Sequence, residues 1–190
     1  MLEIRRATLE DAQIAFDIRL LAIRSQCIGA YTSEQMMVWT RGAAEDGYDA
    51  LMDKPFYLGY VDGDPVATGM LDLANNEIGA LFVLPGFTGR GIGKQVLAYL
   101  EALARELGIK EVILDATLNA ADFYRRCGYV GTEQAIYHSP SGLQLACIPM
   151  RKHLRRSRCH GKKTVVSALA VARELAPAGS RSGPNKAIAI

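Results

Sequence analysis

The sequence predicts one domain of mixed α/β type, with strands and helices packed in layers. The chain has 190 residues, of which 49% are hydrophobic and 22% are charged, as expected for a single domain with a sizeable core. Short apolar runs typical of strands alternate with segments that repeat at the helical period. The central stretch, residues 77–107, combines a strand, a glycine turn and a helix, and the rest of the chain is organised around it.

The first quarter of the chain predicts an edge strand followed by helices. Residues 2–6 alternate, and Thr8 to Asp11 resemble a capping box before a helix that runs to about Gln26. Its inner face is expected to carry Ile14, Ile18 and Leu21, with Ala22 as a further candidate. A second helix begins at 32–35, and a short third helix is expected at 44–52.

The remaining elements follow from alternation, helical period and turn residues. Strands are expected at 56–61, 65–73, 78–84, 111–115, 129–137 and 143–150, and helices at 92–107 and 120–127. The order is strand, two or three helices, three strands, helix, strand, helix and two strands.

The central stretch has the features of an anion-binding loop. Pro85 ends the strand, the turn Gly89-Arg90-Gly91-Ile92-Gly93 follows, and the helix starts at once. Glycines let the backbone wrap closely around an anion, while the free N–H groups and the dipole of the helix favour negative charge there.

Two familiar phosphate-binding patterns do not fit this loop. The dinucleotide pattern G-x-G-x-x-G fails because Lys94 or Val96 stands at its third glycine. The nucleoside triphosphate loop fails because Gln95 follows Gly93-Lys94 and Thr88 replaces the first glycine.

The acetyl-CoA pattern [QR]-x-x-G-x-[GA], which lies after a V-x-P strand end, is the third candidate. Val83 to Pro85 and Gly91 to Gly93 have its spacing. The loop alone would favour a plain glycine turn.

A second motif about 30 residues downstream changes that preference. The segment 119–129, NAADFYRRCGY, is similar to N-x-x-A-x-x-F-Y-x-x-x-G-[FY], with Ala120 and Ala121 as small residues and Asp122 after them. Together with the loop, it makes residues 1–154 resemble the GCN5-related N-acetyltransferase (GNAT) superfamily. The resemblance implies the GNAT fold, a mixed and mostly antiparallel sheet flanked by helices, with acetyl-CoA as co-substrate.

The resemblance also implies which residues bind acetyl-CoA. Tyr124 would lie near the sulfur, and Asn119 would hydrogen-bond the cofactor. A backbone N–H near Leu81 or Phe82 would hold the oxyanion, and the strand ending at Val83 would pair with the pantetheine arm. The pyrophosphate would be bound by the amides of Gly89, Arg90, Gly91, Ile92, Gly93 and Lys94, with Thr88 beside them.

Acetyl transfer to an amine needs a base and an acid. An alkylammonium has a pKa of about 10.4 and must lose a proton before its nitrogen can attack. The departing thiolate, whose thiol has a pKa of about 8.5, leaves more easily when a group of the protein protonates it. Tyr124 is the expected acid, and a simply packed aromatic is the alternative. Glu77 is the candidate base, a position at which some family members carry one. The sequence equally fits the alternative that Glu77 is only a solvated residue at the start of a strand.

One departure from the family pattern points to a bacterial subgroup. Thr88 stands where Gln or Arg is usual, and Phe87-Thr88 is similar to an aromatic-Thr pair in that subgroup. The subgroup motif Y-[ST]-x-E-Q-x-x-x-W is matched by residues 31–39. The resemblance therefore implies that Tyr31, Glu34 and Trp39 wall the acceptor site. A capped amphipathic helix with a buried Trp39 is the alternative.

The predicted function is acetyl-CoA-dependent N-acetylation of a primary amine by direct attack in a ternary complex. The acceptor is a small-molecule or peptide amine, which the sequence does not identify further. A non-catalytic CoA-binding or CoA-sensing module is the alternative. Cys127 precedes a glycine at a helix end, where packing is the expected role, so no covalent cysteine intermediate is predicted.

Composition limits the other functions. No apolar stretch approaches a membrane span, no His, Cys, Asp and Glu spacing predicts a metal site, and the N-terminus lacks a signal-peptide core, so a cytoplasmic protein is expected. Residues 1–150 hold 12 Lys and Arg against 19 Asp and Glu, whereas residues 151–190 hold 10 against one. The tail 155–190 is expected to be basic and disordered, with at most non-specific nucleic-acid contact. The oligomeric state stays open, a homodimer included.

Overall fold

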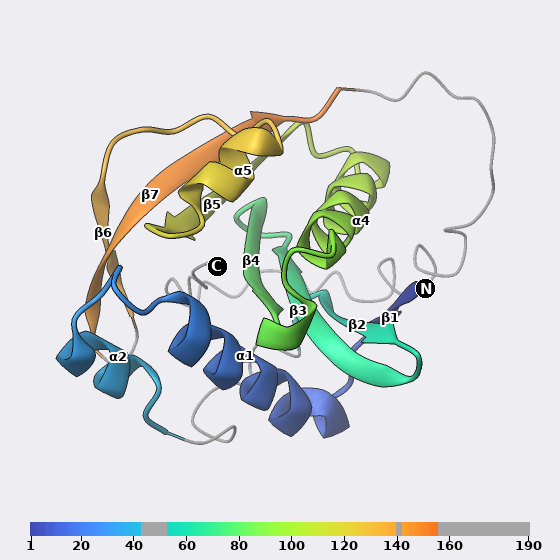
Figure 1. Cartoon of the computed structure of the whole chain (residues 1–190). Helices are drawn as coiled ribbons and strands as arrows, with labels where there is room; N and C mark the ends of the chain where they lie inside the picture. Colours follow the sequence, from blue (N-terminus) through green and yellow to red (C-terminus); the bar gives the residue numbers. More distant parts are fainter. Residues whose placement is uncertain (43–52, 140–141, 156–190) are drawn as a thin grey trace.

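A seven-stranded sheet forms the centre of the protein (Figure 1). The computed structural model describes residues 1–42, 53–139 and 142–155. The strand order is β1-β2-β3-β4-β5-β7-β6, and every neighbouring pair is antiparallel except β4 and β5. The strands are β1 (Leu2–Arg6), β2 (Phe56–Val61), β3 (Asp64–Asp72), β4 (Glu77–Val83), β5 (Glu111–Thr117), β6 (Ala135–His138) and β7 (Gln144–His153). This mixed, mostly antiparallel sheet confirms the expected fold class.

Helices cover both faces of the sheet and divide the core in two. One core joins the sheet to α1 (Ala12–Gln26) and α2 (Ser33–Trp39), and the other joins it to α4 (Ile92–Glu106) and α5 (Ala121–Arg126). Figure 1 shows α1 and α2 on one side of the strands and α4 with α5 on the other. Short 3-10 turns precede α1 at Leu9–Asp11 and follow β4 at Pro85–Phe87.

The inner face of α1 differs from the expected one. Ile18 is buried as predicted, but Ile14 and Leu21 are 37% and 51% exposed, so their assignment to the inner face is wrong. Ala22, the further candidate, is buried, and so is Ala15; these small side chains let the helix lie close to the sheet. Hydrophobic period alone does not distinguish two adjacent stripes on one helix.

A bulge in β4 sets which residues face each core. Thr68 and Met70 of β3 pair with Phe82 and Gly79, so β4 carries one extra residue, and Ala80 adopts a left-handed φ of 48°. The Thr68 hydroxyl donates a hydrogen bond to the Ala80 carbonyl at 2.6 Å.

The extra residue shifts the alternation of β4. Ile78 and Leu81 are three residues apart, yet both pack in the core under α4, while Ala80 and Phe82 pack under α1. Beyond the bulge, the side chains and peptide groups of β4 therefore point to the opposite sides from those that uninterrupted alternation would give.

The strands β4 and β5 separate soon after they meet. In the described chain, Glu77 and Ile113 form their only register pair, and the Ile113 N–H donates to the Asn76 carbonyl at 3.0 Å. On its other side β5 pairs with β7 along its whole length, from Glu111 to Thr117. The sheet thus opens between β4 and β5 at their carboxyl ends (Figure 1).

The strand expected at 129–137 is much shorter than predicted. Only Ala135–His138 form β6, and Val130 makes an isolated bridge to Arg151. Between them, Gly131 crosses β7 so closely that a Cβ atom there would lie 2.2 Å from the Pro149 carbonyl oxygen. Pro149 has no N–H for the ladder, so continuous pairing with β7 is interrupted at this point.

Two other expectations fall on residues that the structure does not describe. The third helix expected at 44–52 lies outside the described residues. The tail expected at 155–190 also lies outside them, apart from Arg155.

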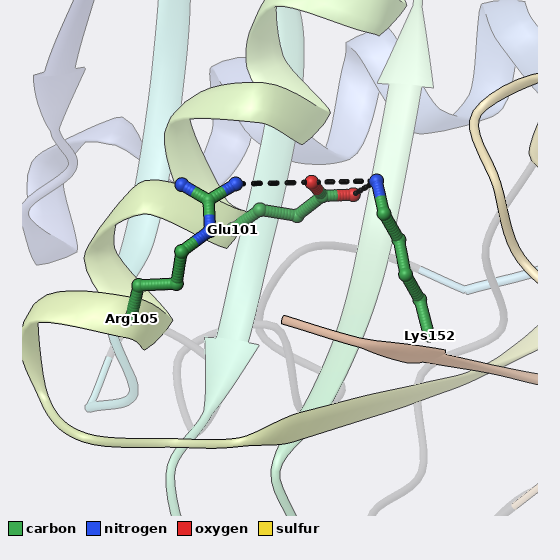
Figure 2. A network of polar contacts seen from close by, with 3 residues as sticks. All are labelled: Glu101, Arg105 and Lys152. Carbon is green, nitrogen blue, oxygen red and sulfur yellow. Dashed lines mark hydrogen bonds and ion pairs between the residues drawn. The ribbon is translucent and has the colours of Figure 1, made fainter. Parts of the chain in front are cut away.

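A buried ion-pair network joins α4 to β7. The Glu101 carboxylate is 4% exposed and accepts hydrogen bonds from Lys152 Nζ at 2.8 Å on both oxygens, with Arg105 Nη2 at 3.4 Å (Figure 2). The ammonium of Lys152 also lies 5.4 Å from the ring centroid of Tyr129. This network fixes the helix that follows the glycine turn against the half of the sheet that contains β5.

We expect Glu101→Ala to lower the free energy of unfolding by about 3 kcal/mol, because it leaves the partly buried Lys152 without its counter-ion. Urea denaturation followed by circular dichroism measures the loss. Asp122→Ala is the matched control, since the Arg125–Asp122 pair at 2.6 Å is largely exposed and should contribute less than about 1 kcal/mol. Equal losses in the two variants would contradict the assigned role of Glu101.

Candidate active site

The glycine turn exposes backbone N–H groups at the start of α4. Gly91 is the N-cap residue with a φ of 76°, and Gly89 has a φ of 74°. A Cβ atom at either position would meet no atom within 4 Å, so conformation rather than space requires glycine here. The first backbone bond into the helix runs from the Gln95 N–H to the Gly91 carbonyl at 3.1 Å. The preceding amides are those that a helix N-terminus leaves for an anion.

The side chains around the turn mainly hold its shape. The Thr88 hydroxyl donates to the Pro85 carbonyl at 2.9 Å, which closes the 3-10 turn before the glycines. The exposed guanidinium of Arg90 lies 5.1 Å from the ring centroid of Phe87. Ile92 is buried, while Lys94 is exposed on the first turn of α4. Of the predicted loop residues, Arg90 and Lys94 therefore place cations next to the exposed amides.

Tyr124 of α5 is completely buried, and its hydroxyl has no hydrogen-bond partner. Burial raises the pKa of this hydroxyl well above its usual value, and the neighbouring Cys127 adds to that. Its ring contacts Phe123 and Tyr129 edge to face, at centroid distances of 4.9 and 5.7 Å. Buried hydroxyls are nearly always paired with protein, water or a ligand, so an unpaired one calls for such a partner, and the hydroxyl of the neighbouring Tyr129 is unpaired as well. The Tyr124 hydroxyl stays protonated at neutral pH.

Two residues of β4 turn their peptide groups away from β3 and toward the opening. Because the Leu84 N–H bonds to Val66 in β3 at 2.8 Å, alternation turns the peptide groups of Leu81 and Val83 toward the opening. Those of Phe82 turn toward β3, with which it pairs. Gln26, which was not among the predicted site residues, donates to the Val83 carbonyl at 2.8 Å. No sequence pattern links Gln26 to β4.

Asn119 lies exposed in the turn after β5, next to the opening. In this turn the Ala120 N–H donates to the Thr117 carbonyl at 3.0 Å, and α5 follows directly. Phe123 of α5 reaches under the start of α4, since a Cβ atom on Gly93 would lie 3.6 Å from its ring. The downstream motif thus lies beside the glycine turn.

Glu77 lies at the bottom of an open cleft on the α1 face of the sheet. The cleft has a volume of about 710 Å³ and is lined by β5, β7 and residues 130–135, with Asp115 beside Glu77. Glu77 is 2% exposed, so the alternative of a solvated residue at a strand start is wrong. Glu133 and Arg151 add charges where the cleft is exposed.

Tyr137 of β6 is a further residue of this face that the sequence analysis did not identify. The pKa of its hydroxyl is raised to about 12, mainly by burial and then by the negative charge of Glu77, while Arg19 of α1 acts in the opposite direction. These charges therefore act on one another although they come from β4, β6 and α1. Their sequence separations leave no signal in the sequence alone.

The motif at 31–39 makes several contacts that connect α2 to the sheet. Thr32 and Gln35 form a capping box, and the Gln35 side chain donates to the Gln144 carbonyl at 3.2 Å. The Tyr31 hydroxyl accepts a hydrogen bond from the Leu118 N–H at 3.1 Å and donates one to the Ala146 carbonyl at 2.7 Å. Trp39 is buried against Tyr31, with ring centroids 5.5 Å apart. Of the three residues expected at the acceptor site, Tyr31, Glu34 and Trp39, only Glu34 is exposed.

Within the described ranges, no cluster of three or more His, Cys, Asp and Glu residues could hold a metal ion. Over the same residues, no helix has the length and apolar character needed to cross a membrane.

Two sequence comparisons place this chain among acetyltransferases. The family model of the acetyltransferase (GNAT) family matches residues 25–129, which is more than half of the chain. A curated relative from rice (Oryza sativa subsp. japonica), a probable glucosamine 6-phosphate N-acetyltransferase, is 43% identical over 51 residues. That match covers 26% of this chain and 31% of the relative, so the chain aligns with less than a third of the rice protein.

Solved structures agree with the family match. A GCN5-related N-acetyltransferase from Rhodopseudomonas palustris, also described as a class-II aminotransferase, has a TM-score of 0.74 and 28% identity, covering 80% of this chain and 95% of that one. The PaiA N-acetyltransferase of Thermoplasma acidophilum, solved with coenzyme A, shares the fold with a TM-score of 0.59 and 18% identity, covering 80% and 99%. Together with the family model, these likenesses show that the chain belongs to the acetyltransferase (GNAT) family.

Proposed function

We propose that this protein transfers the acetyl group of acetyl-CoA to a primary amine by direct attack in a ternary complex. The observation that carries the proposal is the opening between β4 and β5, which has the amides of a helix N-terminus near it and a buried hydroxyl without a partner beside it. Donor and acceptor would meet there, one from each face of the sheet.

The residues around the opening fit acetyl-CoA. The N–H groups of Gly89 to Lys94 suit a pyrophosphate, with the cations of Arg90 and Lys94 adding attraction. The Leu81 N–H, turned toward the opening, is the proposed oxyanion donor, and Phe82 supports it by pairing with β3. Asn119 lies where it can reach the pantetheine arm. When bound, the co-substrate supplies an activated acetyl group, and the protein supplies its orientation.

The acceptor is proposed to enter through the cleft above Glu77. A volume of about 710 Å³ accommodates a small molecule or a single extended side chain. The carboxylates of Glu77, Asp115 and Glu133 outnumber Arg151 in the lining of the cleft, which gives it an acidic character that favours a cationic amine. Tyr31 and Trp39 would contribute as buried supports of the wall, and Glu34 by its charge at the surface.

The direct test is release of free CoA from acetyl-CoA with a panel of primary amines. Because the rice relative is named for glucosamine 6-phosphate, the panel includes that amino sugar beside diamines, amino acids and lysyl peptides. We expect turnover with at least one amine, and an increase of its KM as salt screens the acidic cleft. Tight binding of acetyl-CoA without turnover of any amine would favour a non-catalytic CoA-binding module instead.

Tyr124 is proposed to donate the proton that the departing thiolate takes up. Its raised pKa keeps the hydroxyl protonated at neutral pH, and its burial keeps water from competing for the hydrogen bond. We expect Tyr124→Phe to lower kcat about 100-fold with little change in the Kd of acetyl-CoA, measured by steady-state kinetics and calorimetry.

The same substitution also tests whether the hydroxyl is free of a structural role. Removing a buried hydroxyl that has no partner should leave the free energy of unfolding unchanged or slightly higher. An unchanged kcat would remove Tyr124 from the mechanism.

Glu77 is proposed as the base that accepts the proton of the acceptor ammonium, directly or through water. In this role the rate rises with pH as the carboxylate forms, which gives the ascending limb of the pH–rate profile. We expect Glu77→Gln to lower kcat/KM and to abolish that limb. Glu133→Gln is the control, because it removes an exposed carboxylate of the same cleft and should keep the limb. An unaltered limb in Glu77→Gln would exclude Glu77 as the base.

A further inference from the structure

Thr117, the last residue of β5, has a buried hydroxyl that the fold does not use. Its side chain is 0% exposed, and its Oγ1 has no hydrogen-bond partner. An unpaired buried hydroxyl typically costs about 1–3 kcal/mol relative to a paired one. Thr68 on β3 is equally buried, but its hydroxyl bonds to the Ala80 carbonyl at 2.6 Å. The hydroxyl of Thr68 therefore makes a hydrogen bond within the fold, whereas the hydroxyl of Thr117 makes none.

The polar groups near Thr117 already have partners. The Tyr31 hydroxyl bonds to the Leu118 N–H at 3.1 Å and to the Ala146 carbonyl at 2.7 Å. The carbonyl of Thr117 itself accepts from the Ala120 N–H at 3.0 Å. These bonds hold the end of β5 in place, and none of them uses the Thr117 Oγ1.

Thr117 lies on the acceptor face of the sheet. Side chains alternate along a strand, so Ile113, Asp115 and Thr117 share one face of β5. The first two line the cleft, and Cys147, which pairs with Thr117, belongs to the core under α1. Thr117 is fully buried and is not among the residues that line the cleft, but it is the next residue of this face, so a ligand that extends past Asp115 toward the unpaired edge of β4 would approach its side chain.

The partnerless hydroxyls of Tyr124 and Thr117 belong to opposite faces of the sheet. Tyr124 packs in the core under α4 and α5, whereas Thr117 faces the side of α1. In acyl transfer, the leaving group and the attacking nitrogen are both bonded to the carbonyl carbon at different positions. Tyr124 is proposed to serve the sulfur, and a hydroxyl on the other face is suitably placed for the nitrogen.

We propose that the Thr117 hydroxyl accepts a hydrogen bond from the N–H of the acceptor amine and so directs the nitrogen lone pair toward the acetyl carbon. The inference rests on the proposed N-acetyltransferase function and adds a substrate-contacting residue to it. A hydroxyl oxygen can accept such a bond while its own proton remains available to a neighbouring acceptor atom. The expected benefit is orientation of the nucleophile.

The experiment compares three variants with the wild type, using the amine that gives the highest turnover in the acceptor panel. Thr117→Val removes the hydroxyl at constant shape, Thr117→Ser keeps it, and Thr68→Val removes a paired buried hydroxyl. Steady-state kinetics give kcat and KM for the amine, calorimetry gives the Kd of acetyl-CoA, and thermal unfolding gives Tm.

We expect Thr117→Val to lower kcat/KM for the amine about tenfold or more while the Kd of acetyl-CoA is unchanged. Its Tm should equal or exceed that of the wild type, because no protein hydrogen bond is lost. Thr117→Ser should recover most of the activity. Thr68→Val should lower Tm by about 2–4 °C, as expected for the loss of about 1 kcal/mol in a chain of this size.

Three results would overturn the inference while leaving the acetyltransferase function intact. These are an unchanged kcat/KM in Thr117→Val, a loss of Tm as large as that of Thr68→Val, or a weaker Kd for acetyl-CoA that accounts for the loss of activity. A wild-type protein that turns over no amine would instead contradict the proposed function itself, and the role of Thr117 with it.

Discussion

The short contact between β4 and β5 is the constraint on which the rest of the structure depends. These two strands are the only parallel neighbours in the described sheet, and they pair at Glu77 and Ile113 before they separate. Unpaired backbone groups inside a protein cost free energy unless a partner satisfies them. The open edges are therefore a place where an extended ligand can add hydrogen bonds that the fold itself does not make.

Several contacts of the protein keep the two strands apart. The bulge at Ala80 shifts the side-chain alternation of β4, and the hydrogen bond from the Thr68 hydroxyl to the Ala80 carbonyl holds the bulge in place. Gln26 at the end of α1 binds the Val83 carbonyl, while Tyr31 ties the end of β5 to β7. None of these bonds crosses the opening, so each strand is held on its own side and the separation is built into the folded state.

Polar groups in the interior are treated in two different ways. The Glu101 carboxylate has cations on both sides, and it holds α4 against β7. The hydroxyls of Tyr124 and Tyr129 in the core under α4 and α5, and that of Thr117 at the end of β5, have no partner among the described residues. A fold that pairs a buried charge but leaves these hydroxyls unpaired gives up some stability there, as is common where a ligand completes the hydrogen bonding.

The sequence by itself determined the order of elements and the glycine turn. The reason is that period, proline and glycine act locally: Pro85 ends a strand and Gly91 allows a left-handed N-cap whatever lies elsewhere in the chain. The downstream segment around Tyr124 was recognised in the same way, by a pattern of neighbouring residues. The placement of Leu81 toward the opening was only partly predictable, since it depends on a bulge that no residue type announces.

Tertiary structure alone decided which side chains share the site. It buried Glu77, connected the motif at 31–39 to the sheet, shortened β6 where Gly131 meets Pro149, and brought in Gln26, Tyr137 and Thr117. Each of these results depends on contacts between residues far apart in the chain, set by sheet register and by close packing. A local pattern carries no information about such distances, because the same alternation fits either face of a strand until its neighbours are in place.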